Sequence, residues 1–184
     1  SSSQKIIEQI TTSFQTPEVI RVMGDVLSIP DLEADPSLYA GGASMMFEGD
    51  YLNPHIDNSH DANREKYRRL NLLFYISPDW KLEYGGNFEL WDKKVESQKT
   101  IISKFNRLVV METNNNSFHS VSPVSSNQPR CCISNYYFHQ ESSNGDEYFH
   151  VTSFTGRPNE VGKRVLGKID NFARDIISNT LKLG

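Results

Sequence analysis

The 184-residue chain is poor in cysteine, with two residues that are adjacent, Cys131 and Cys132. Adjacent cysteines make a strained and rare bridge, so the sequence excludes a disulfide framework. This absence favours a reducing, cytoplasmic setting. No apolar run approaches the ~20 residues of a membrane helix. Residues 1–5 lack the charged and then apolar pattern of a signal peptide.

The chain also lacks a strong charge of either sign. Its net charge of −4 gives no reason to expect nucleic acid or an anionic membrane as the main partner. A hydrophobic content of 37% and a charged content of 23% are typical of a globular chain that can bury one core. We expect one domain over residues 1–184, with N-terminal helices (1–37), a β core (38–155) and a C-terminal helix (156–184). The oligomeric state is not predicted.

Helical spacing of apolar residues marks both ends of the chain. The first helix is predicted over residues 3–14. A second follows Thr16-Pro17-Glu18, an N-cap with proline at the first helical position, and stops before Pro30. A last helix is predicted after Asn159, and its apolar stripe is expected to pack on the domain: Val161, Val165, Ile169, Phe172 and Ile176.

The middle of the chain is a series of short apolar or alternating runs separated by turn residues. This spacing predicts a mainly β fold, an antiparallel sandwich or jelly roll with flanking helices. The series begins at Met45–Phe47 and continues with Tyr51–Ile56, Leu70–Ile76, Asn87–Trp91, Lys99–Ile102, Arg107–Glu112, Phe118–Val121 and Cys131–Phe138, and Tyr148–Phe154 could add one more strand.

Three residues of the β region could hold a metal. In an extended strand, His55 and Asp57 point to the same face. They would form two thirds of the two-His-one-carboxylate face that binds non-haem Fe(II) and leaves open positions. His119 could supply the third ligand from another strand. A lone strand histidine is more often a hydrogen-bonded structural residue, so both interpretations of His119 stand.

Arg130 follows His119 by eleven residues and begins a predicted strand. A hairpin of that length would bring its guanidinium back near the metal. A buried arginine needs an anionic partner, and the far carboxylate of a dicarboxylate ligand would suit it. The alternative is a surface or salt-bridged arginine without a role in binding.

The order His-x-Asp, distal His, then Arg resembles the iron(II)- and 2-oxoglutarate-dependent dioxygenases, in their prolyl 4-hydroxylase-like branch. The resemblance covers roughly residues 40–140. It rests on matching pieces in the same order: Gly49–Asp57, Leu70–Trp80, Tyr84–Trp91, Phe105–Val110, Ser117–Pro123 and Pro129–Phe138.

The resemblance implies a double-stranded β-helix that holds Fe(II) through His55, Asp57 and His119. It implies that 2-oxoglutarate binds the metal and pairs its far carboxylate with Arg130 and Tyr75. With O2, the enzyme would hydroxylate an unactivated C–H and release succinate and CO2, with ascorbate as an accessory reductant. Residues beyond the metal ligands are given no catalytic role.

The resemblance also indicates further positions that could line the pocket. Asn71 shares a strand face with Tyr75 and could line the pocket. Cys132 stands where the family usually has a serine that touches the co-substrate, and a thiol is a poorer donor. Phe47 stands where many relatives have a tyrosine near the metal.

The substrate is open. A prolyl residue of a peptide is the natural extension of the resemblance, and a small-molecule or sugar-linked metabolite is the alternative. A jelly-roll binding module without catalysis and a cupin-like metalloenzyme without 2-oxoglutarate are further alternatives. The polar stretch Asn58–Arg69 is either a solvated loop or short helix, or a lid beside the metal. It and Tyr148–Phe154 are where we expect substrate contacts.

Overall fold

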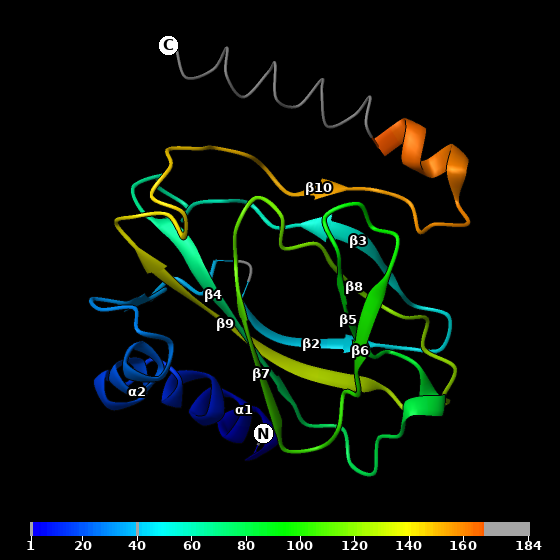
Figure 1. The fold of residues 1–184 in the computed structure, drawn as a ribbon. Coiled ribbons are helices and arrows are strands. Elements are labelled where there is room, and N and C mark those ends of the chain that lie inside the picture. Colours follow the sequence, from blue (N-terminus) through cyan, green and yellow to red (C-terminus); the bar gives the residue numbers. More distant parts are fainter. Residues whose placement is uncertain (1, 40, 168–184) are drawn as a thin grey trace.

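The computed structural model describes residues 2–39 and 41–167 (Figure 1). Two N-terminal helices precede a succession of strands, with one short 3-10 helix between β4 and β5. The elements are α1 (Ser2–Ser13), α2 (Pro17–Leu27), β1 (Glu33–Ala34), β2 (Gly42–Met46), β3 (Leu52–Ile56), β4 (Tyr67–Tyr75), η1 (Leu82–Tyr84), β5 (Phe88–Trp91), β6 (Gln98–Ile101), β7 (Arg107–Glu112), β8 (His119–Val121), β9 (Arg130–His139) and β10 (Ser153–Phe154).

The strands form two sheets in which every pairing is antiparallel. One has the order β1-β9-β4-β7, with β2 also paired to β9, and the other has the order β10-β3-β8-β5-β6. Neighbouring strands are mostly distant in sequence, which is typical of a jelly roll. The predicted mainly β jelly-roll fold is confirmed.

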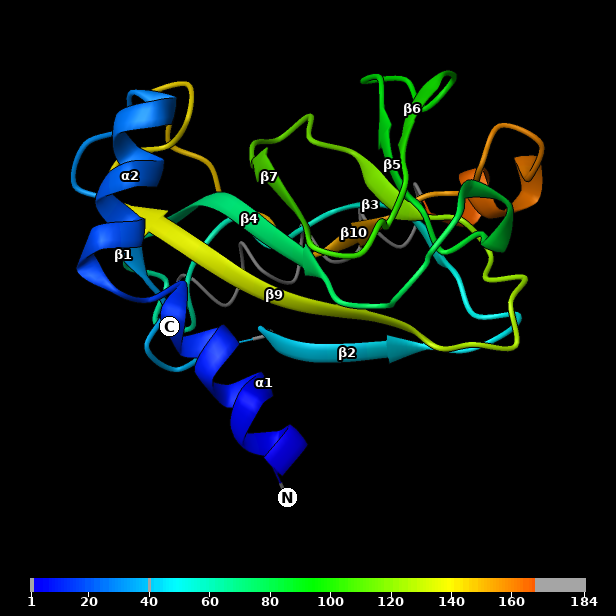
Figure 2. The same ribbon diagram turned by 90° about the horizontal axis from the view of Figure 1, so that it is seen from below.

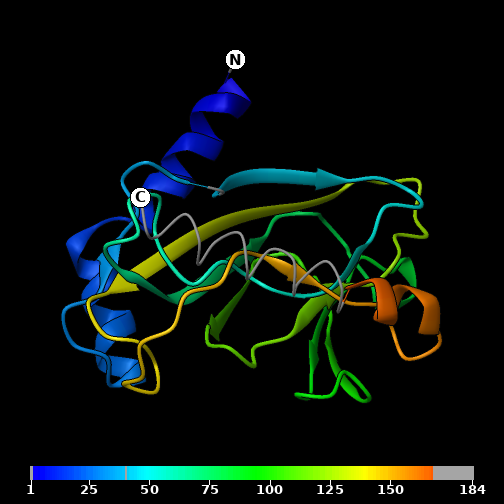
Figure 3. The same cartoon turned by 90° about the horizontal axis from the view of Figure 1, so that it is seen from above.

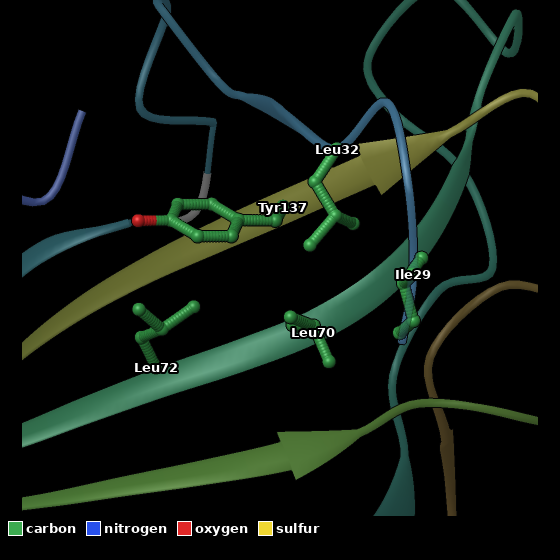
Figure 4. Close-up of a cluster of buried hydrophobic side chains, with 5 residues drawn as sticks. All are labelled: Ile29, Leu32, Leu70, Leu72 and Tyr137. Atoms are coloured by element: carbon green, nitrogen blue, oxygen red, sulfur yellow. The ribbon is translucent and has the colours of Figure 1, made fainter. Parts of the chain in front are cut away.

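The side chains of β4 alternate between two cores, as the period of a strand requires. Leu70 and Leu72 point to one side and pack with Ile29, Leu32 and Tyr137 (Figure 4). The residues that alternate with them face the other sheet. Tyr75, for example, packs there with Phe88, Val109, Met111 and Cys132. The strand therefore carries a structural core on one face and leaves the other face for the site.

The two helices lie against the outer side of the β9-containing sheet (Figure 2). The hydroxyl of Tyr137 donates to the carbonyl oxygen of Phe14, which ties the end of α1 to β9. Helix α2 begins after Thr16 with Pro17 at its first position and ends at Ser28, whose φ of 56° is left-handed. Both predicted helices are confirmed.

Some predicted boundaries are wrong. Strand β4 begins at Tyr67, because Tyr67 and Arg68 already pair with β9. The last three residues of Asn58–Arg69 therefore belong to a strand and not to a loop. Of the stretch Tyr148–Phe154, only the last two residues form a strand.

The C-terminal helix is described over residues 161–167. There Val161 and Val165 are 68% and 54% exposed, so this part of the predicted stripe does not pack on the domain. The other three residues of the stripe lie outside the described residues. Within residues 2–39 and 41–167, no helix is long and apolar enough to cross a membrane.

The core between the helices and the sheet should dominate stability. Leu72→Ala removes a side chain that is 1% exposed and should lower the free energy of unfolding by about 3 kcal/mol. Chemical denaturation measures this change. Val26→Ala, at a side chain that is 74% exposed, is the control and should change it by less than about 0.5 kcal/mol. Equal effects would contradict the assignment of this core.

Candidate active site

Strand pairing brings the three predicted metal ligands together. His55 lies on β3 beside its cross-strand partner His119 on β8, and Asp57 directly follows the last residue of β3. The Nε2 atoms of His55 and His119 lie 3.5 Å from Oδ1 and Oδ2 of Asp57, respectively. One ligand atom from each residue lies within 4.8 Å of the others. This donor set and spacing fit a metal ion with open positions.

Both imidazoles are oriented for metal binding. The Nδ1 atom of His55 lies 2.9 Å from the carbonyl oxygen of Asn53, and that of His119 lies 3.0 Å from the carbonyl oxygen of Ser117. A carbonyl oxygen only accepts, so each ring donates from Nδ1 and keeps the Nε2 lone pair for a metal. The two lone pairs converge on the Asp57 carboxylate.

The charge states also suit a metal. Burial lowers the pKa of His119 to about 4, and the nearby His55 adds to this, so the imidazole of His119 is neutral at pH 7 and could bind a metal. Burial alone would raise the pKa of Asp57, but His55, His119 and Arg68 together outweigh it. They hold the pKa of that carboxyl well below its usual range, so Asp57 is ionised.

Two side chains of β4 contact the Asp57 carboxylate and orient it. The amide nitrogen of Asn71 donates to Oδ2 over 2.6 Å, and Nη1 of Arg68 lies 3.5 Å from the same atom. The Arg68 guanidinium stacks 3.9 Å from the centre of the Tyr136 ring. Its Nε and Nη2 atoms are buried and have no hydrogen-bond partner among the described residues. Arg68 is 1% exposed, so its charge acts on Asp57 from within the core.

Arg130, the first residue of β9, is 5% exposed. Its Nε donates to the carbonyl oxygen of Gly86 over 3.0 Å, and Nη1 lies 3.6 Å from the sulfur of Met46. No acidic side chain in the described part of the chain forms an ion pair with Arg130. A buried guanidinium without an anion is costly, which indicates a site for an anionic ligand.

Tyr75 faces the same space. The Arg130 guanidinium lies 4.9 Å from the centre of its ring. The Tyr75 hydroxyl is buried and has no hydrogen-bond partner within the described residues. Burial raises the pKa of Tyr75 to about 12, against the opposing effect of the Arg130 charge, so the phenol remains a donor at working pH. Donor and cation together suit a carboxylate.

The Gly85-Gly86 turn allows this close approach. At Gly86 the backbone has a φ of +59°, and a Cβ atom there would come within 3.2 Å of the Arg130 side chain. Glycine alone tolerates both conditions. The same carbonyl that accepts from Arg130 also accepts from the hydroxyl of Ser103 over 2.7 Å. The turn thereby fixes the orientation of Arg130.

The other predicted pocket residues differ in their placement. Asn71 binds Asp57 and so supports the metal ligand. Cys132 is 1% exposed and packs with Tyr75, whereas Phe47 is 55% exposed. The contact of Arg68 with Asp57 was not predicted, because Arg68 belongs to the polar stretch Asn58–Arg69. A local signal was available, since Arg68 lies two residues before the apolar run that begins at Leu70.

Comparison with known proteins agrees with this geometry. The family model of the 2OG-Fe(II) oxygenase superfamily matches residues 41–138, which is more than half of the chain. The chain therefore belongs to the 2OG-Fe(II) oxygenase superfamily. Fe(II) and 2-oxoglutarate are accordingly its cofactor and co-substrate.

The relatives are prolyl hydroxylases. Mouse (Mus musculus) prolyl 3-hydroxylase OGFOD1 is 32% identical over 96 residues, which are 49% of this chain and 17% of that protein. A prolyl 4-hydroxylase structure from Phytophthora capsici has a TM-score of 0.56 at 16% identity and covers 92% of this chain and 55% of its own. The viral collagen prolyl hydroxylase vCPH from Paramecium Bursaria Chlorella virus-1, in its 2OG complex, has a TM-score of 0.52 at 14% identity over 73% of this chain and 72% of its own. At these identities the structures show the shared fold.

The contact between Asn71 and Asp57 should affect metal affinity. Asn71→Ala removes the donor that orients the carboxylate, and should weaken Co(II) binding by roughly 10–100-fold. Titration of the metal-free protein with Co(II), followed by its visible absorption, measures this. Asn144→Ala, in an exposed loop, should leave the affinity unchanged. Equal affinities of the two variants would contradict the role given to Asn71.

Proposed function

We propose that this protein is an Fe(II)- and 2-oxoglutarate-dependent dioxygenase that hydroxylates a prolyl residue of a peptide. The observation that carries the proposal is the buried pair of Arg130 and Tyr75, which presents an unpaired charge and an unpaired hydroxyl in the same core as a two-His-one-carboxylate cluster. A metal cluster alone would also fit a cupin-like enzyme. The added carboxylate site favours 2-oxoglutarate.

In this proposal, each group of the site has one task. His55, Asp57 and His119 hold Fe(II), and Asn71 and Arg68 keep the carboxylate of Asp57 ionised and oriented. Bound iron, with 2-oxoglutarate and O2, supplies an oxidation that yields succinate, CO2 and one hydroxyl group on an unactivated C–H of the substrate.

The far carboxylate of 2-oxoglutarate is bound by protein side chains and not by the metal. Arg130 can bind it bidentately, since its fork of N–H groups matches two carboxylate oxygens. Tyr75 adds a hydroxyl donor from the neighbouring strand. Cys132 packs beside them as an apolar wall, because a thiol donates weakly. Burial of all three side chains excludes water and strengthens the ion pair.

The similarity to mouse prolyl 3-hydroxylase favours proline as the target residue. A metabolite hydroxylase remains the second candidate. A binding module without catalysis would leave the buried arginine and the metal cluster without a purpose.

The reaction itself is tested by conversion of 2-oxoglutarate to succinate. The protein with Fe(II), ascorbate and O2 should produce succinate and add one oxygen (a gain of about 16 Da) to prolyl peptides, as seen by mass spectrometry. His119→Ala should abolish succinate formation, since a metal ligand is lost. His139→Ala, at the far end of β9, is the matched control and should remain active. Activity of His119→Ala would contradict the metal site.

Tyr75→Phe should have opposite effects on stability and on binding. Without ligand, the variant removes an unsatisfied buried hydroxyl and should be as stable as the original protein or more stable. Its affinity for 2-oxoglutarate should fall by about tenfold, because one hydrogen bond to a carboxylate is lost. Thermal unfolding and calorimetric titration of the Co(II)-loaded protein measure the two effects. Loss of stability with unchanged affinity would show that Tyr75 is only a core residue.

Accessory reduction by ascorbate, the cytoplasmic setting and a lid role for the stretch Asn58–Arg69 stay predictions from the sequence. The role of ascorbate can be tested in the assay above. Omitting ascorbate from it should lower the number of turnovers without changing the product.

A further inference from the structure

The two histidines of the metal cluster lie on neighbouring strands whose pairing is irregular. Leu52 on β3 opposes Val121 on β8, and His55 opposes His119, so three steps along β3 match two steps along β8. The extra residue on β3 is a β-bulge, which locally disrupts the ladder of hydrogen bonds between two strands. The imidazole rings of His55 and His119, whose centroids lie 4.1 Å apart, are therefore not held in place by a regular ladder between β3 and β8.

On its other side, β8 pairs with β5 in a regular register. Ser120 opposes Glu89, and His119 opposes Leu90. Successive residues of a strand face opposite sides of the sheet, so His119 faces the metal side and Ser120 faces the far side. Directly opposed residues share a face, so the side chains of Ser120 and Glu89 meet on that far side. An interaction there can fix β8 on β5 without contacting the metal.

The far side of the sheet holds such an interaction, a buried network around one carboxylate. The hydroxyl of Ser120 donates to Oε2 of Glu89 over 2.5 Å and accepts from Nε1 of Trp91 over 2.8 Å. Nη1 of Arg157 lies 2.8 Å from the same Oε2, and Nη2 donates to the carbonyl oxygen of Val121 over 3.1 Å. Glu89 and Ser120 are 4% and 0% exposed. One guanidinium therefore holds a side chain of β5 and the backbone of β8 together.

Arg157 is also connected to the strand that carries His55. Figures 1 and 3 show β10 lying beside β3, with which it pairs. Directly after β10, the amide of Thr155 donates over 2.8 Å to the carbonyl oxygen of Pro54, the residue before His55. Only Gly156 separates Thr155 from Arg157. This short segment therefore binds β3 at one end and both β8 and β5 at the other.

We propose that Arg157 is a positioning residue that sets the separation of the imidazoles of His55 and His119. It acts through Glu89 and Ser120, from the side of the sheet that faces away from the metal. It bridges the two strands at the place where their own pairing is irregular. This role rests on the proposed function, because the positioned residues are the ligands that would hold Fe(II).

A purely structural role of the network would give a different result. Breaking a buried ion pair lowers stability whatever else the pair does. Positioning predicts, in addition, weaker metal binding by protein that is still folded. Groups that orient metal ligands without binding the metal typically change its affinity by 10–100-fold. Metal affinity and stability must therefore be measured separately.

The main variant removes the ion pair without leaving a buried charge unpaired. Glu89→Leu and Arg157→Met are combined, because apolar residues of similar volume often replace a buried pair without loss of stability. Thermal unfolding measures stability, and titration of the metal-free protein with Co(II), followed by its visible absorption, measures affinity and ligand geometry. We expect an unfolding temperature close to the original, a Co(II) affinity about tenfold lower and a changed absorption spectrum.

A conservative variant and two controls complete the test. Arg157→Lys keeps the charge but loses the fork of N–H groups, so it cannot hold Glu89 and Val121 together. Its Co(II) affinity should lie between those of the original protein and the double variant. Leu32→Ala, in the core between helices and sheet, should lower the unfolding temperature and leave Co(II) binding unchanged. Arg21→Met, which removes an exposed ion pair, should change neither property.

Each outcome decides between the two roles. An unchanged Co(II) affinity and spectrum in the folded double variant overturn the positioning role. If the double variant does not fold, Arg157→Lys decides in the same way: lower Co(II) affinity than in Leu32→Ala supports positioning, and equal affinity overturns it.

The proposed function fails in a distinguishable way. A protein whose Co(II) affinity depends on Arg157, but which neither binds nor converts 2-oxoglutarate, overturns the proposed function and leaves the positioning role in place. A protein that does not bind Co(II) overturns both.

Discussion

The site depends on one constraint: Arg130 places a permanent positive charge in a core with no acidic side chain beside it among the described residues. Such a charge is costly to bury, so the fold is arranged to receive an anion there. The buried hydroxyl of Tyr75, which has no hydrogen-bond partner among the described residues, also favours an acceptor at this place. Both groups lie within the β sandwich that also positions the cluster of His55, Asp57 and His119.

The jelly-roll topology explains how distant residues meet. The two sheets place β3 beside β8, so that His55 and His119 become cross-strand neighbours although 64 residues separate them. In the other sheet, β4 lies between β9 and β7, so that Asn71 reaches Asp57 while Tyr75 reaches Arg130. One strand thereby supports both halves of the site, and its opposite face forms the structural core.

Much of this could be predicted from the sequence, because short-range patterns carry it. The helix at Pro17, the strand Arg107–Glu112 and the shared face of His55 and Asp57 follow from local periodicity and turn residues. The place of His119 and Arg130 came from the resemblance, whereas contacts that depend on the detailed strand register were not predictable. Arg68 was assigned to a polar loop because a sequence cannot show that a β-bulge turns this charge towards Asp57.

The most direct test of this account compares 2-oxo acids that differ only in the far carboxylate. Calorimetric titration of the Co(II)-loaded protein with 2-oxoglutarate and with 2-oxovalerate, which lacks that group, measures how much of the affinity depends on it. We predict that 2-oxovalerate binds about a hundredfold more weakly, and that Arg130→Ala removes the difference. Equal affinities in the original protein, or an unchanged difference in Arg130→Ala, would contradict the assignment of Arg130 as the co-substrate anchor.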